Sequence, residues 1–201
     1  MAVITAAEAR LLIPSLKGAT EDTNLDTFIG RADAILADSV GIPAASAVGS
    51  ATFDSATYTR YYEGEPDGKT VELGFIPITS ITSVHDDPDR VYGSSTLVSS
   101  GDYDLEGDTG IIRLTTTGTH GSFSQQVRSI KVVFVAGYTA TTAPEHIKQA
   151  VAMMARHLWR LRKEQGSASL GKKGELRDET IPAAINQMLS PAIGIASVAF
   201  G

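Results

Sequence analysis

The chain has 201 residues, 42% of them hydrophobic, with a formal net charge of −6 at pH 7 and no cysteine. This length allows one good hydrophobic core or one domain with an insertion, while the missing cysteines exclude disulfides and thiolate metal sites. No apolar stretch reaches the roughly 18 residues of a membrane span, and the first residues lack the pattern of a secretory signal, so we expect a soluble protein made in a cytoplasm.

The charges are unevenly distributed along the chain. Residues 1–155 carry 10 Lys and Arg against 19 Asp and Glu, whereas residues 156–201 carry 7 against 4. The basic segment is either a helix C-terminus and a solvated loop, or a docking segment for an acidic partner. Nucleic acid is a poor candidate partner, because the acidic remainder would repel phosphate and no aromatic residues alternate with the cations. The basic residues are Arg156, Arg160, Arg162, Lys163, Lys172, Lys173 and Arg177.

Helical patterns dominate the first forty residues. Thr5 and Glu8 have the spacing of a capping box, so a helix is expected over about residues 6–12. A second cap, Asp22 or Asn24, precedes apolar residues at the i, i+3, i+4, i+7 spacing of an amphipathic helix.

Short β-prone runs replace this period between residues 57 and 138. Glycine-containing turns at residues 65–68 and 106–110 separate them. They predict a small antiparallel β-sheet or partly open barrel. The expected strands cover residues 58–62, 70–73, 78–85, 103–105, 111–114 and 130–135.

The helical period returns after residue 138. Pro144 suits the first turn of a helix whose apolar stripe follows at spacings of three and four residues. A glycine-rich connection, residues 166–174, leads to a short helix that should begin near Pro182 and end before Pro191. The uncharged tail through Phe200 either folds back on its own core or docks on a neighbour.

These elements predict an α+β fold in two parts. Residues 1–56 and 139–201 would form a helical bundle, the base, with a C-terminal arm. Residues 57–138 would form a β insertion between the two helical segments.

Three motifs resemble known binding sites without meeting their requirements. Residues 166–173 approach a phosphate-binding loop, but Lys173 replaces the Ser or Thr that holds magnesium. Residues 102–107 imitate the start of a calcium loop, but Arg113 stands where a bidentate Glu is required. The acidic run at residues 86–89 is typical of a turn. Weak calcium binding at the two acidic turns stays open.

Catalytic patterns are missing from the sequence. The four histidines show no metal-ligand spacing, and no Gly-x-Ser-x-Gly nucleophile elbow is present. We therefore expect no enzyme activity, no catalytic residues, no bound metal and no cofactor.

One succession of segments points to a family. A β-run at residues 130–135 leads into Ala-Gly-Tyr, a short loop, and a helix that starts Pro-Glu-His-Ile-Lys-Gln-Ala at Pro144 and reaches His-Leu-Trp at Trp159. Residues 4–9, 75–84 and the proline-led segment 181–191 add to the pattern. In this order the chain resembles the head-tail connector, or adaptor, proteins of tailed bacteriophages, prophages and gene-transfer particles. It departs from the family in the apolar extension after Pro191.

The resemblance implies a structural virion protein. Such proteins form a ring under the portal, commonly of twelve copies, which extends the DNA channel and docks stopper or tail-completion proteins. It implies assembly in the host bacterial cytoplasm and a final location in the virion neck. DNA would pass through the channel without specific binding, and an acidic body suits such a wall.

A portal-binding segment is expected near the C-terminus. Its basic residues would steer it to an acidic surface, and its apolar residues would form the buried contact. The expected portal-binding residues are Arg160, Arg162, Lys163, Lys172, Lys173, Arg177, Ile181, Ile185, Met188, Leu189 and Phe200.

The alternative function is a β-rich module that binds calcium or a glycan through the acidic turns at residues 86–89 and 102–108. Calorimetry with calcium would separate the two functions. A third possibility is a hydrolase with an unrecognised site.

Overall fold

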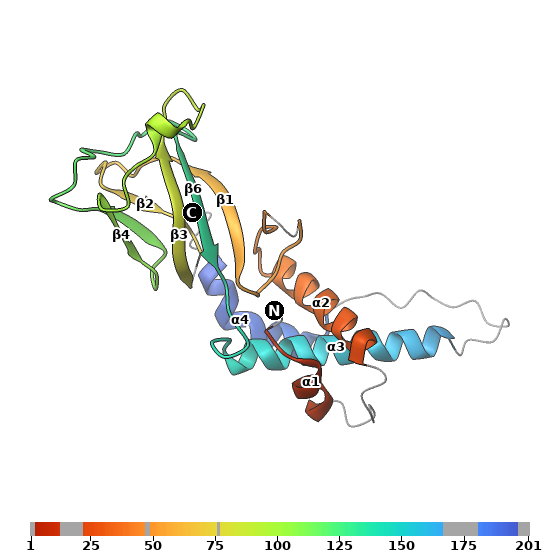
Figure 1. The fold of residues 1–201 in the computed structure, drawn as a ribbon. Helices are drawn as coiled ribbons and strands as arrows, with labels where there is room; N and C mark the ends of the chain where they lie inside the picture. Colours follow the sequence, from red (N-terminus) through yellow and green to blue (C-terminus); the bar gives the residue numbers. More distant parts are fainter. Residues whose placement is uncertain (1–2, 13–21, 47–48, 76, 167–180, 197–201) are drawn as a thin grey trace. The chain divides into compact units, whose positions relative to one another are not determined.

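The computed structural model describes residues 3–12, 22–46, 49–75, 77–166 and 181–196 (Figure 1). The chain divides into two compact units. The helical unit comprises Met1–Ile42, Ala51–Phe53 and Tyr138–Ile193, and the β unit consists mainly of Pro43–Ser50 and Asp54–Gly137.

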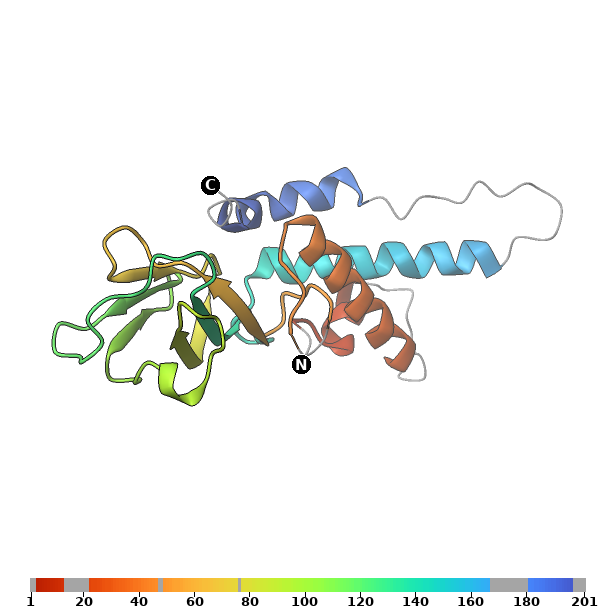
Figure 2. The ribbon, with the colours of Figure 1, turned by 90° about the horizontal axis from the view of Figure 1, so that it is seen from above.

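Four α-helices are described: α1 (Ala6–Leu12), α2 (Asp22–Ser39), α3 (Glu145–Gly166) and α4 (Ala183–Ala196). The capping box that starts α1 is present, since Thr5 N–H donates to Glu8 Oε2 over 2.8 Å and Glu8 N–H donates to Thr5 Oγ1 over 3.2 Å. The hydrogen bond from the Thr5 backbone lowers the pKa of Glu8. In Figure 2, α2 crosses α3, and α4 lies alongside α3.

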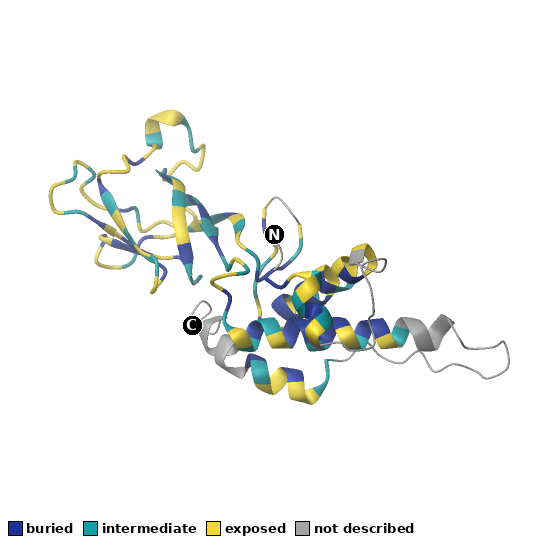
Figure 3. Ribbon diagram, turned by 60° about the horizontal axis from the view of Figure 1, so that its bottom comes forward, coloured by how far each residue is buried: buried dark blue, intermediate teal, exposed yellow. Residues whose placement is uncertain are grey.

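The core of the helical unit is formed by the apolar faces of these helices, seen as dark stripes in Figure 3. Phe28 of α2 meets Trp159 of α3 edge to face, with 5.4 Å between ring centroids. The buried carboxylate of Asp33 accepts hydrogen bonds from Thr52 Oγ1 and Phe53 N–H, over 2.6 and 3.2 Å. These bonds attach residues 51–53 to α2.

The β unit contains two three-stranded antiparallel sheets in the order β1–β6–β3 and β2–β5–β4. Their inner faces share one core, in which the Tyr58 and Phe134 rings stack with centroids 5.7 Å apart. Burial alternates along β6, as expected of a sheet with one covered face. The strands are β1 (Ala56–Tyr62), β2 (Thr70–Glu72), β3 (Ile78–Asp86), β4 (Tyr103–Glu106), β5 (Ile111–Leu114) and β6 (Ile130–Ala136).

The prediction of a mixed fold with an antiparallel β region is confirmed, with two differences. Two small sheets replace the single sheet or partly open barrel, and the described strands form no closed barrel. The predicted end of the last helix, before Pro191, was wrong, because α4 continues through Pro191 to Ala196. Proline removes one hydrogen-bond donor, but its fixed φ near −65° is itself helical, so a helix continues past it at a cost. None of the described helices is long and apolar enough to cross a membrane.

Candidate partner-binding surfaces

The basic residues predicted to bind the portal lie only partly within the described structure. Arg160 is exposed on α3. Arg162 and Lys163 also belong to α3, but their side chains are not described. Lys172, Lys173, Arg177 and Phe200 lie outside the described residues.

The apolar residues of the same segment pack against the chain's own core. Ile185 and Leu189 of α4 are each 1% exposed in the helical core, and Ile181 and Met188 pack against it partly buried. Ile185 and Leu189, four residues apart, lie on the inward face of α4. A partner that contacts α4 in this conformation therefore meets its exposed positions, which among the side chains described, up to residue 189, are Ala183, Ala184, Asn186 and Gln187.

The acidic turn at residues 86–89 organises a loop of the β unit. The Asp87 carboxylate accepts backbone hydrogen bonds from Asp89 and Val91, each over 3.0 Å, and from Tyr92 over 2.6 Å. These bonds, that from Tyr92 foremost, lower the pKa of Asp87. The carboxylate thus fixes the path of residues 87–92.

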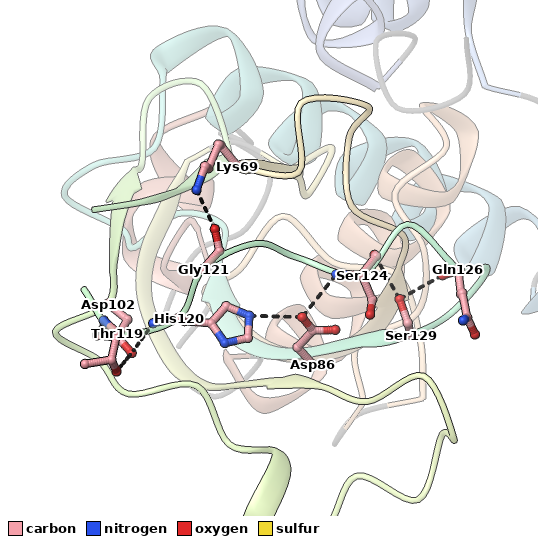
Figure 4. A network of polar contacts seen from close by, with 9 residues as sticks. All are labelled: Lys69, Asp86, Asp102, Thr119, His120, Gly121, Ser124, Gln126 and Ser129. Atoms are coloured by element: carbon pink, nitrogen blue, oxygen red, sulfur yellow. Dashed lines mark hydrogen bonds and ion pairs between the residues drawn. The ribbon is translucent and has the colours of Figure 1, made fainter. Parts of the chain in front are cut away.

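A second carboxylate, that of Asp102, holds the beginning of the β5–β6 connection (Figure 4). It accepts hydrogen bonds from Thr119 N–H, Thr119 Oγ1 and His120 N–H, over 2.9, 3.0 and 3.2 Å. The hydrogen bond from the Thr119 backbone is the main cause that lowers the pKa of Asp102. Both acidic turns therefore have a structural role.

Asp86 holds the same connection further along. Its Oδ2 lies 3.0 Å from His120 Nε2 and accepts the Ser124 N–H over 3.1 Å, and the Asp86 side chain is only 6% exposed. Ser129 Oγ donates to the Ser124 and Gln126 carbonyls, over 3.0 and 2.8 Å. As Figure 4 shows, residues 119–129 are anchored at several points along their length. The described residues contain no group of three or more His, Cys, Asp or Glu that could hold a metal ion.

These two anchored loops meet at one end of the β1–β6–β3 sheet and form an aromatic-cation cluster of Tyr61, Tyr92, Arg128 and Lys131. The tyrosine ring centroids are 5.3 Å apart. The Arg128 guanidinium lies 4.7 Å from the Tyr61 centroid, and Lys131 Nζ lies 5.6 Å from that of Tyr92. Both are cation–π distances. Tyr92 Oη also donates a hydrogen bond to the Arg128 carbonyl.

The backbone at this cluster is strained. Among the described residues, only three non-glycine residues have positive φ, and all three lie here: Arg90 at 62°, Tyr92 at 54° and Arg128 at 60°. A left-handed conformation costs a residue with a side chain about 1–2 kcal/mol. Such strain concentrates at functional sites. The sequence does not indicate this cluster, because the two loops come together only through the fold.

The outer face of the β2–β5–β4 sheet has the opposite character and is called the acidic face. It carries Glu72, Asp104 and Glu106 around the half-buried Ile111 and one cation, Arg113. Arg113 Nε lies 3.1 Å from Glu106 Oε1, with both side chains about half exposed. Such an exposed ion pair contributes little to stability.

Comparison with solved structures identifies similar folds. A chain from the neck of an empty gene transfer agent (GTA) particle, computed with C6 symmetry, has 16% identity and a TM-score of 0.56, covering 92% of this chain and 88% of that chain. A chain from the virion of a native GTA particle has 19% identity and a TM-score of 0.54, covering 92% and 89%. A chain from the neck of a native GTA particle, computed with C12 symmetry, has 17% identity and a TM-score of 0.50, covering 83% of this chain and 82% of that chain.

The family comparison covers nearly the whole chain. No curated protein matches it. The family model described as head completion protein matches residues 3–191. With the structural matches, this confirms the resemblance to the head-tail connector family that the sequence indicated. The chain therefore belongs to the head completion protein family.

Proposed function

We propose that this protein is a head-tail connector in the neck of a tailed particle. It assembles as a ring under the portal, extends the DNA channel and docks a stopper or tail-completion protein. The observation that carries the proposal is the family match over residues 3–191, supported by a fold shared with chains of GTA particles. This function needs surfaces rather than a catalytic centre.

A ring of twelve copies is the form we propose. One of the similar necks was computed with C6 and another with C12 symmetry. In a closed ring of more than two copies, each chain presents two different surfaces, one to each neighbour. The acidic balance of residues 1–155 agrees with a channel wall along which DNA slides without binding.

For the portal contact we propose the end of α3 and the segment that follows it. Arg160 is exposed there, and the basic residues up to Arg177 follow in sequence. Because Ile185 and Leu189 serve the chain's own core, their contribution to portal binding would be to hold α4 in place. The exposed positions of α4 would meet the partner.

The test is the assembly of particles without this chain. We expect DNA-filled heads that bear portals but no tails, because the tail would have no surface on which to dock. Adding the purified protein to these heads should restore tail attachment. Normal numbers of tailed particles in its absence would contradict the proposal.

A further inference from the structure

In the part of the chain that the structure describes, the large exposed apolar side chains are concentrated at one place. Of the five large hydrophobic residues that are exposed in the described structure, four lie at or next to the aromatic-cation cluster. Tyr61 belongs to the cluster, and Val91 and Val127 directly precede its members Tyr92 and Arg128. Leu97 forms a backbone bridge with His85, and His85 is the partner of Lys131 in the sheet. Their exposed fractions are 39%, 78%, 61% and 52% for Tyr61, Val91, Val127 and Leu97. A gathering of this kind marks an interaction surface.

The surface is also held in a fixed conformation. The Asp87 carboxylate fixes the loop that displays Val91, and the contacts of Asp86 and Asp102 anchor the connection that leads to Val127. Two of the three residues with positive φ, Arg90 and Tyr92, lie in the loop whose backbone N–H groups bond to Asp87. A preorganised surface loses little conformational entropy when a partner binds.

Cations are concentrated at this surface, and of the three carboxylates in the same loop those of Asp86 and Asp87 already accept hydrogen bonds from this chain. Residues 54–137 contain 12 Asp and Glu against 6 Lys and Arg, and three of those six cations, Arg90, Arg128 and Lys131, lie here. The partner therefore needs acidic groups beside an apolar centre. The acidic face meets this description, since its Glu72, Asp104 and Glu106 surround Ile111.

The two surfaces lie on opposite layers of the β unit. Tyr61 and Lys131 point outward from the β1–β6–β3 sheet, because Tyr58 and Val132 occupy its inner face. The acidic face is the outer side of the other sheet, whose Ile112 points into the same core. Two complementary surfaces on opposite sides of one subunit are what a head-to-tail ring contact requires.

We propose that the aromatic-cation cluster of each copy, with Val91 and Val127, binds the acidic face of the next copy in the ring. This inference rests on the proposed function and identifies the contact between neighbouring subunits. Charge complementarity steers the two faces together, and the tyrosines and valines supply the apolar contact.

Cross-linking in assembled particles tests the contact, because the natural chain has no cysteine. Val127→Cys and Asp104→Cys are placed in one chain, and purified particles are treated with a short bismaleimide. We expect a ladder of covalent multimers of this chain, whereas either substitution alone should give monomer. As a matched control, Thr57→Cys replaces Val127→Cys; Thr57 is exposed on the same face of β1 as Tyr61, four residues or about 13 Å along the strand.

The cross-linking outcomes separate this contact from the proposed function. A chain that is incorporated into tailed particles but gives no ladder would overturn the inference and leave the connector function standing. A cross-link to another particle protein would show that the cluster faces a different partner, and a dimer from Val127→Cys alone would show a two-fold contact. Absence of the chain from particles would overturn both.

A charge exchange gives an independent test. Arg90→Glu with Arg128→Glu makes the cluster acidic, and Asp104→Lys with Glu72→Lys makes the acidic face basic. Each variant alone should assemble about tenfold less than the natural chain, because like charges then face each other. A mixture should assemble again, since alternating copies restore opposite charges at every contact. Melting temperatures near that of the natural chain would show that the variants fold. If the mixture of folded variants does not regain assembly, the proposed contact is contradicted.

Discussion

Single carboxylates determine the conformation of the longest connections in the β unit. Asp102 bonds to Thr119 and His120, and Asp86 bonds to His120, so pairs separated by 17 to 34 residues become neighbours. The sequence indicates a turn at residues 86–89 and a similarity to the start of a calcium loop at residues 102–107. It could not show which backbone groups the carboxylates bind, because those partners arrive from distant parts of the chain.

Replacing Asp102 with Asn should lower the stability of the β unit. The amide keeps the shape of the side chain but weakens the hydrogen bonds from Thr119 and His120, since bonds to a charged acceptor are stronger. The melting temperature measures the effect, with the exposed Asp104→Asn as control. Equal melting temperatures for the two variants would show that the Asp102 contacts do not hold the connection.

The stability of the β unit should decrease in acid. The pKa values of Asp87 and Asp102 are lowered in the folded chain from an ordinary value of 3.8, chiefly by backbone hydrogen bonds. The unfolded state therefore binds more protons in this range, so the stabilisation is fully present above about pH 4 and is lost as the pH falls through the folded pKa values. Urea unfolding between pH 2 and 6 measures this effect. The free energy of unfolding should depend less steeply on pH in the double variant Asp87→Asn and Asp102→Asn than in the natural chain. An unchanged dependence would contradict this assignment.

At the scale of elements, hydrophobic period and turn residues predicted most of the fold. Strand β5 occupies the expected residues 111–114, and the capping box at Thr5 begins α1 as expected. The pairing of strands into two sheets was beyond reach, because β6 pairs with β1 and β3 across long sequence separations. The extent of α4 differs from the prediction, because Pro191 lies within the helix and does not end it.

The role of α4 leads to a stability prediction. Ile185→Ala removes a side chain that is 1% exposed in the helical core, so the free energy of unfolding should fall by about 2–4 kcal/mol. Gln187→Ala, at an exposed position of the same helix, should change it by less than about 0.5 kcal/mol. Chemical denaturation measures both. If both substitutions lower the free energy of unfolding by similarly small amounts, α4 does not complete this core.

The β region itself we propose as a separately folding insertion, residues 57–138 between a helical base of residues 1–56 and 139–201. Its own hydrophobic core, with Tyr58 and Phe134 at the centre, supports this organisation. A fragment of residues 43–137 should unfold cooperatively and show a β-type circular dichroism spectrum. A fragment without a cooperative transition would contradict the proposal.

For the whole molecule, the basic C-terminal segment predicts that portal binding depends on salt. Reversing Lys172, Lys173 and Arg177 to Glu should slow association with the portal most at low ionic strength, because screening weakens long-range attraction as salt rises. Stopped-flow or surface-based association rates measure the effect. Equal association rates for the natural and reversed C-terminal segments would place the portal contact elsewhere.

The central claim is that this chain forms a ring on the portal. Its most direct test is electron cryomicroscopy of DNA-filled, portal-bearing heads incubated with the purified protein. The connector function predicts an added ring of twelve subunits under the portal, with the channel continuing through it. Portals that remain bare at saturating protein, or chains bound only to the outside of the head, would contradict the assignment.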